Sequence, residues 1–223
     1  MTLTYFKLYY HSLQYIIGVI AAVLIWQWKI FRALWTFFGF IKKKVETCEY
    51  NPDYPKFVKA EIARLKPIME KYNGLQPFNG KAIYHTGSTA IVGMFGKPII
   101  DLSICTKNML PDIPDGLLKD LKDIGYEYWG PAPHNKNKYL DQWFARTENG
   151  TQFLIHFLEG EETKIALAKF INFVDYCNAN KGAHKRYSDV KKGGLGMNLM
   201  DYSFNKFKIY REIMKEANAW KAA

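Results

Sequence analysis

One short block of the sequence contains the residue types that bind phosphate and metal ions. It runs over residues 84–101 and reads YHTGSTAIVGMFGKPIID. Gly87 and Ser88 form a turn that opens a helix, where free backbone N–H groups and a hydroxyl can hold an anion. Asp101 lies on the next expected strand, where its carboxylate could hold a magnesium ion that bridges phosphates. The block therefore predicts a nucleotide site.

Each residue of this block also has a structural alternative. Gly87 suits any tight turn, and Ser88 suits the N-cap of a helix. Lys97, which would offset phosphate charge, could equally be a solvated charge at a strand edge. Asp101 sits in an otherwise apolar strand, where an unpaired charge is costly, so we expect a metal ion or Lys97 beside it. For Gly87, Ser88 and Asp101 we prefer a role in ligand binding over a purely structural one. For Lys97 both roles stay open.

Two histidines and a tyrosine–lysine pair are further candidates. His85 and His156 occupy expected strands, where a histidine in the core or at its rim is the commoner outcome. Tyr187 and Lys191 lie one helical turn apart and could reach the phosphates from the far side. A solvated helix face is the favoured interpretation of that pair.

The elements that must position the block are those of an α+β domain. Apolar residues at helical spacing predict helices over 55–72, 117–124, 162–177, 182–192 and 201–220. Apolar runs and alternation predict strands over 81–86, 98–105, 139–146 and 151–158. The last two strands pair as a hairpin around Asn149-Gly150. The order of these elements predicts a mixed or antiparallel sheet flanked by helices.

The stretch HTGSTAIVGMFGKPIID resembles the GrpB-like family of the nucleotidyltransferase superfamily. The family's block has the form H-x-G-S-T-A-hydrophobic-x-G-hydrophobic-x-x-K-P-x-x-D, and nine positions match it: His85, Gly87, Ser88, Thr89, Ala90, Gly93, Lys97, Pro98 and Asp101. The likeness extends over about residues 50–216. It implies a nucleotidyltransferase-like mixed sheet in which Gly87, Ser88, Thr89 and Lys97 bind a nucleoside triphosphate. It also implies that Asp101 is the catalytic, magnesium-binding acid.

The sequence departs from the superfamily's pattern at the second acid. The resemblance implies two or three carboxylates, because one metal activates the attacking hydroxyl and another stabilises the leaving pyrophosphate. Ser103 stands two residues after Asp101, on the same strand face, where an acid is expected. The strand over 151–158 contains no acid, and Glu159 only follows its end. One hypothesis is transfer of a nucleotidyl group to an unknown acceptor; the alternative is a catalytically inactive nucleotide-binding or scaffolding module.

The first 48 residues differ in composition from the remainder. Residues 13–28 (LQYIIGVIAAVLIWQW) carry no charge, and residues 1–48 hold six Lys/Arg against one acid. A bilayer span needs about 20 residues, which the run reaches if Lys29 and Arg32 snorkel to the headgroups. We expect a membrane anchor and basic linker over 1–48, single-pass through residues 13–41, and a GrpB-like domain over 49–223 on the cytosolic side. A signal peptide, a mitochondrial presequence and a helix docked on the domain are the alternatives.

Charge and cysteine content limit the partners. The net charge of +10 is concentrated in the first 48 residues and diluted beyond them, so a nucleic-acid partner is not expected. The three cysteines show no metal-like or redox spacing, which favours free thiols in a reducing compartment.

Overall fold

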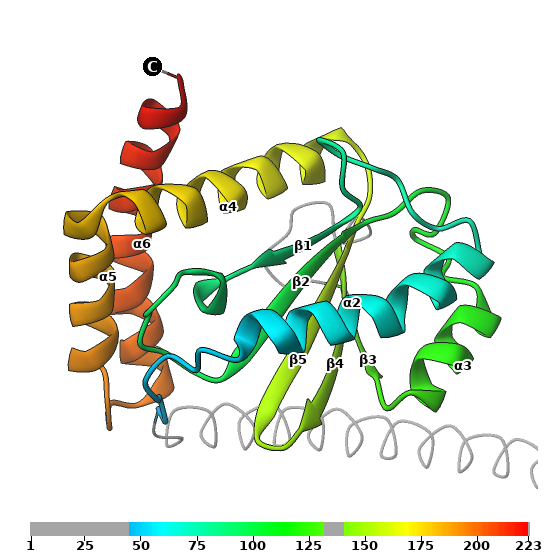
Figure 1. The fold of residues 1–223 in the computed structure, drawn as a ribbon, viewed down its shortest axis with the longest axis horizontal. Helices are drawn as coiled ribbons and strands as arrows, with labels where there is room; N and C mark the ends of the chain where they lie inside the picture. Colours follow the sequence, from blue (N-terminus) through cyan, green and yellow to red (C-terminus); the bar gives the residue numbers. More distant parts are fainter. Residues whose placement is uncertain (1–44, 132–140, 223) are drawn as a thin grey trace, which may run out of the picture.

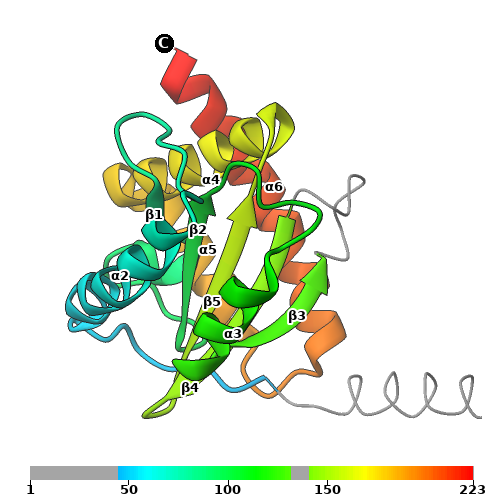
Figure 2. The same ribbon diagram turned by 90° about the vertical axis from the view of Figure 1, so that its right-hand side faces the viewer.

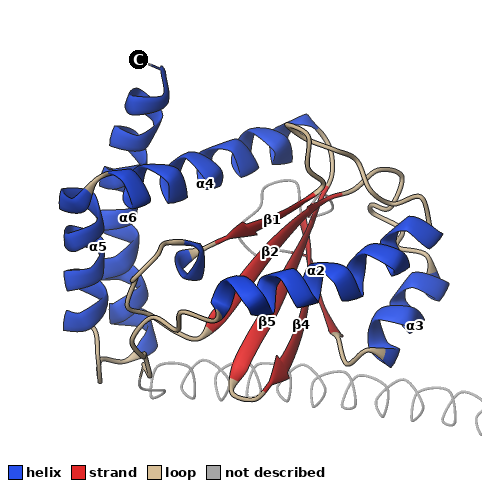
Figure 3. Ribbon diagram, in the orientation of Figure 1, coloured by secondary structure: helices blue, strands red, loops and turns tan. Residues whose placement is uncertain are grey.

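A five-stranded mixed sheet forms the centre of the structure, a computed structural model that describes residues 45–131 and 141–222. The strands are β1 (Ile83–Thr86), β2 (Ile99–Cys105), β3 (Glu127–Pro131), β4 (Asp141–Glu148) and β5 (Thr151–Leu158). Their order in the sheet is β1-β2-β5-β4-β3. β2 and β5 run parallel, whereas every other neighbouring pair is antiparallel. The sheet is therefore mixed, as predicted (Figure 3).

Helices flank this sheet (Figure 1). They are α2 (Tyr54–Lys71), α3 (Asp115–Asp123), α4 (Glu161–Ala179), α5 (Lys181–Gly193) and α6 (Leu199–Ala222), with a 3-10 turn η1 (Ser88–Ala90) after β1. α2 and α3 pack on one side of the sheet, while α4, α5 and α6 lie on the other side, with α5 and α6 beside each other (Figures 1 and 2). The predicted α+β class is confirmed.

The main core lies between the sheet and the helices α2 and α3. Ile100, Leu102 and Ile104 of β2 are fully buried there, together with alternate residues of β4 and β5. Because side chains alternate along a strand, this register sends Asp101 and Ser103 to the opposite face. The main core therefore fixes the strand that carries the candidate acid.

A buried ion pair joins α2 to β4 inside this core. Glu61 is buried and accepts a hydrogen bond from Arg146 Nε at 3.0 Å, while Arg146 Nη2 contacts its other oxygen. Tyr126 donates its hydroxyl to the same carboxylate at 2.8 Å. The guanidinium group also lies 4.4 Å from the centroid of the Phe153 ring. These contacts satisfy both charges within the apolar core.

A second core forms among α4, α5, α6 and the segment that follows the Gly-Ser turn. Ile91 and Met94 of that segment are buried against Phe173 of α4, Tyr187 of α5 and Ile213 of α6. The three C-terminal helices thus hold the segment between β1 and β2 in place. α4, α5 and α6 therefore cover the side of the Gly-Ser turn that faces away from the sheet.

The sequence predicts most elements within a few residues of their observed bounds. All five predicted helices and all four predicted strands are confirmed. β3 was missed, because its sequence EYWGP contains a glycine and a proline and its Tyr128 and Trp129 are exposed at the sheet edge. A β-bulge between Tyr128 and Gly130 breaks the alternation further.

The predicted membrane-spanning helix and the single-pass membrane localisation are corrected. Within residues 45–131 and 141–222, no helix has the length and apolarity to cross a bilayer. The three helices of 18 or more residues, α2, α4 and α6, interleave charged with apolar side chains, which a hydrocarbon core does not accept. Residues 13–41, on which that prediction and the membrane partner rested, lie outside the described residues.

Candidate functional site

The Gly-Ser turn follows directly after β1. Gly87 has φ +69°, a left-handed conformation that favours glycine. A Cβ at Gly87 would lie 1.9 Å from Oδ2 of Asp101, so the absence of a side chain lets that carboxylate approach the turn. Ser88 begins the short 3-10 turn η1 and remains partly exposed. The structure thus brings Gly87, Ser88 and Asp101 together, as the motif predicts.

Thr89 and His85 form a hydrogen-bonded link behind the turn. Thr89 is buried, and its hydroxyl donates to the carbonyl oxygen of Ile99 at 2.8 Å. His85 Nε2 lies 2.9 Å from the same hydroxyl and must therefore donate to it. Burial lowers the pKa of His85 to about 4, against a weaker opposing effect of Asp101, so the ring is neutral at pH 7. The Thr89 hydroxyl tethers β1 and η1 to the start of β2.

Asp101 belongs to a row of polar side chains across the sheet face opposite the main core. His156 of β5 lies between two carboxylates, with Nε2 3.8 Å from Asp101 Oδ1 and Nδ1 3.5 Å from Asp141 Oδ1. At these distances the imidazole forms ion pairs with the two carboxylates, but the hydrogen bonds are too long to be strong. Trp143 donates its indole N–H to Asp141 at 3.0 Å and packs edge-on against the imidazole.

Burial would lower the pKa of His156, but the two carboxylates outweigh it and raise the pKa to about 9. The ring is therefore protonated at pH 7 and offsets part of the charge of Asp101. Asp141 is a second carboxylate that the sequence reasoning missed, since it begins the first strand of the hairpin, 40 residues after Asp101 in the chain. Asp141 begins β4 two residues before Trp143, and no motif in the sequence marks such an aspartate as part of a site.

Two other residues near the expected acid positions have structural roles. Ser103 is buried, and its hydroxyl lies 3.0 Å from that of Thr86. Glu159 accepts hydrogen bonds from the backbone N–H groups of residues 108–110 at 2.8 to 3.2 Å, which holds the loop after β2. Neither side chain contributes a charge beside Asp101. The second acid of the superfamily's pattern is thus not replaced from either position.

Lys191 of α5 brings an ammonium group to the Gly-Ser turn. Its side chain is 2% exposed, and its Nζ has no hydrogen-bond partner among the described residues. A Cβ at Gly96 would lie 2.6 Å from that Nζ and 3.4 Å from Oγ of Ser88, so both polar groups converge on this glycine. The amine also lies 4.9 Å from the centroid of the Tyr187 ring. The interpretation of Tyr187 and Lys191 as a solvated face is wrong, because both are buried.

Two further lysines surround the same place. Lys97 and Lys206 lie 5.7 and 5.8 Å from the centroid of the Tyr202 ring. Burial lowers the pKa of Lys191 to about 7; repulsion by Lys206 and Lys97 adds to the shift, and attraction by Asp101 opposes it. Burial also lowers the pKa of Lys206, again against Asp101. Asp101 itself keeps 23% of its side chain exposed, so a ligand can reach it.

The donor set around Asp101 is that of an anion site rather than of a resident metal site. Within the described part of the chain, no group of three or more His, Cys, Asp or Glu side chains is placed to hold a metal ion. The charged groups that interact with Asp101 are instead lysines and a protonated histidine. A polyanion with several oxygens would find both backbone and side-chain donors here.

The structure is an α+β protein with a mixed sheet, in which a Gly-Ser turn lies beside an aspartate-bearing strand. The GrpB protein family model matches residues 44–216. This chain therefore belongs to the GrpB family, whose members have a nucleotidyltransferase-like fold, as the resemblance predicted.

Individual relatives agree with this assignment. A UPF0157 protein of Halalkalibacterium halodurans is 27% identical over 176 residues, which cover 77% of this chain and 81% of that protein. The glutamate-rich protein GrpB of Alkalihalophilus pseudofirmus is 31% identical over 128 residues, 57% of this chain and 70% of that one. The crystal structure of the conserved protein GrpB from Enterococcus faecalis has a TM-score of 0.58 at 24% identity, over 77% of this chain and 98% of that one. That likeness concerns the fold alone.

Proposed function

We propose that the site at the Gly87-Ser88 turn binds the phosphate chain of a nucleoside triphosphate. The observation that carries the proposal is the ammonium group of Lys191, which is buried at the turn without a hydrogen-bond partner among the described residues. An unpaired charge in such a place is costly, and an anionic ligand relieves that cost. Lys97 and Lys206 lie close enough to Lys191 to repel its charge, so they add positive charge around the turn.

Asp101 has a different task in this proposal. One carboxylate among cations does not form a metal site by itself, but the Asp101 side chain lies against Gly87 and is partly exposed. Asp101 would be the protein ligand of a magnesium ion that the triphosphate brings with it. The protonated His156 on its other side limits the net negative charge that an approaching phosphate meets.

Isothermal titration of the full-length chain tests this proposal. The ligands are ATP and inorganic tripolyphosphate, each with and without magnesium, so that binding of phosphate is separated from binding of the base. A hydrogen bond to a charged group contributes about 1.5–3 kcal/mol, so Lys191→Met should weaken binding roughly 10- to 150-fold. Lys192→Met is the matched control, since this neighbouring lysine is exposed, and we expect a change of less than about twofold.

The outcomes separate the roles of the two residues. Equal affinities of wild type and Lys191→Met would refute the proposal. Removing the negative charge in Asp101→Asn should tighten binding without magnesium and weaken it with magnesium. Tighter binding under both conditions would exclude Asp101 as a magnesium ligand and leave the phosphate site itself intact.

Nucleotidyl transfer is the second candidate, favoured by the contact between Asp101 and the phosphate-binding turn. The superfamily's chemistry requires more than one carboxylate, and Asp141 is paired with His156 and Trp143 instead. Binding without turnover is therefore the better supported of the two. A pyrophosphate-release assay with the full-length chain distinguishes them, and release that Asp101→Asn abolishes would establish transfer.

A further inference from the structure

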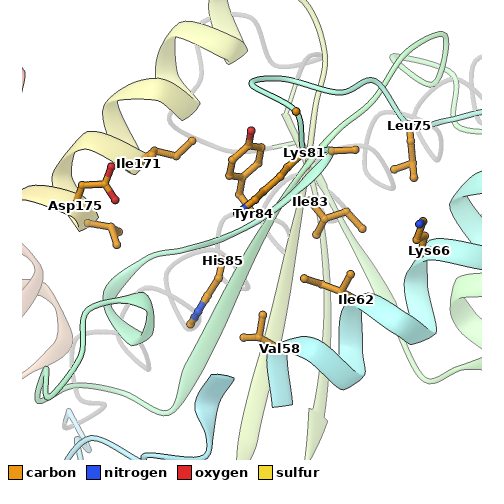
Figure 4. Close-up of a pocket in the computed structure, with 13 residues that line it drawn as sticks. Val58, Ile62, Lys66, Leu75, Lys81, Ile83, Tyr84, His85, Ile171 and Asp175 are labelled. Carbon is orange, nitrogen blue, oxygen red and sulfur yellow. The ribbon is translucent and has the colours of Figure 1, made fainter. Parts of the chain in front are cut away.

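A groove separate from the phosphate site runs along the outer edge of the sheet (Figure 4). It has a volume of about 790 Å³ and lies between α2 and α4, with β1 as its floor. Val58 and Ile62 of α2 form one wall, and Ile171 and Val174 of α4 form the other. In Figure 4, Ile171 lies on one side of β1, and Val58 and Ile62 lie on the other. The walls are thus largely apolar.

The floor of the groove is a strand edge with free hydrogen-bonding groups. β1 is the outermost strand, paired only with β2 on its inner side. Ala82 faces β2, because its carbonyl accepts a hydrogen bond from Cys105 N at 2.8 Å. The direction of the backbone groups alternates along a strand, so the N–H and C=O groups of Ile83 and His85 point outward into the groove. No strand of the described chain pairs with them.

The charge at the groove has a preferred sign. Lys66 and Lys81 line it, and Lys81 is exposed. Lys66 makes only a loose, solvent-exposed pair with Glu70 at 3.6 Å, which leaves most of its charge available. The acid in the lining, Asp175, is paired with Lys221 at 3.6 Å. The groove is therefore complementary to an acidic partner.

We propose that this groove binds an extended peptide segment of another protein, which adds as a strand to the outer edge of β1. The backbone of an extended chain satisfies the outward groups of Ile83 and His85, which a helix cannot do because its own backbone groups are already paired. Alternate side chains of the peptide contact the apolar walls, and an acidic residue meets Lys66 or Lys81. A second copy of this chain fits less well, because its β1 edge is recessed between its own helices.

Selection from a phage-displayed library of random twelve-residue peptides against the full-length chain tests the proposal. We expect enrichment of sequences that alternate apolar residues and carry at least one acid. A selected peptide should slow hydrogen exchange of the outward amides of Ile83 and His85. N-methylation of the peptide at the amides that face β1 should abolish binding, while N-methylation at the intervening amides should not.

Protein variants supply the second readout. Lys81→Glu reverses an exposed charge at the groove and should weaken the selected peptide about threefold or more, whereas Lys122→Glu, an exposed lysine of α3, should not. Both substitutions are on the surface, so folding is preserved. Failure to select any peptide, binding that is insensitive to N-methylation, or dimer formation through β1 in light scattering would each overturn the proposal.

Discussion

Replacing Lys191 with methionine isolates the free-energy cost of an ammonium group buried at the turn. Burial, with repulsion by Lys206, lowers the pKa of Lys191 from 10.5 to about 7. This difference corresponds to roughly 5 kcal/mol of unfavourable free energy for keeping the charged form in the fold. Methionine has a similar length, carries no charge and packs well in irregular apolar sites. We therefore expect Lys191→Met to be more stable than the wild type in the absence of ligand.

The pH dependence of this difference has a defined sign. Because folding lowers the pKa of Lys191, the unfolded chain binds this proton more tightly, and the stability of the wild type rises with pH between about 7 and 10.5. Below pH 7 the lysine is charged in both states and the advantage of methionine is largest, up to roughly 5 kcal/mol. At about pH 9.5 the advantage should shrink to roughly 1 kcal/mol.

Urea unfolding in phosphate-free buffer at about pH 6, 7.5 and 9.5, followed by tryptophan fluorescence, measures these differences. Lys192→Met serves as the control, because its exposed ammonium group should contribute less than about 1 kcal/mol at any pH. The reasoning is refuted if Lys191→Met is less stable than the wild type at pH 6. It is also refuted if the advantage of the variant does not decrease as the pH rises.

Three further substitutions test other parts of the structure. Gly87→Ala places a Cβ 1.9 Å from the carboxylate of Asp101 at a φ of +69°, so urea unfolding should show a loss of about 2 kcal/mol or more; unchanged stability would contradict this. Glu61→Gln removes the buried carboxylate that pairs with Arg146 and leaves only the half-exposed Glu148, 3.0 Å from Nη1, as its charge partner. The change should cost about 2–3 kcal/mol by the same assay, with ATP affinity retained in calorimetry. Folding raises the pKa of His156 to about 9, so the stabilisation by its charge is complete below pH 6.5 and is lost as the pH rises through 9. The free energy of unfolding of the wild type, relative to that of His156→Gln, should therefore fall by up to about 3 kcal/mol over this range. A difference between the two proteins that does not change with pH would refute the pairing.

The elements with strong periodicity could be predicted from the sequence, and those held by tertiary contacts could not. The helix α2 and the strands β2 and β5 combine regular apolar spacing with clear turn signals, and their observed bounds agree within about two residues. β3 lacks both features, since it is a short edge strand whose large side chains are exposed. Its place in the sheet is determined by pairing with β4, which no local pattern encodes.

The candidate site divides in the same way. Gly87, Ser88 and Asp101 belong to one local motif, so their proximity follows from a strand, a turn and a second strand. Asp141 and Lys191 come from distant elements, and only the sheet register and the packing of α5 bring them to the motif. Spacing alone favours a solvated helix face for Lys191, and charged residues are rarely buried without a partner. That rarity is the reason why its burial is informative.

Gly87 and Gly96, two glycines within residues 84–101, connect the fold to the proposed function. Gly87 needs its conformational freedom, but Gly96 has no left-handed conformation that would require glycine. Its lack of a side chain is explained by close approach alone, since a Cβ there would occupy the place of the Lys191 ammonium group. One glycine thus admits a carboxylate and the other a cation, with Ser88 beside them. A turn that served only to reverse the chain would need neither charge, so this arrangement argues for a ligand that contacts both.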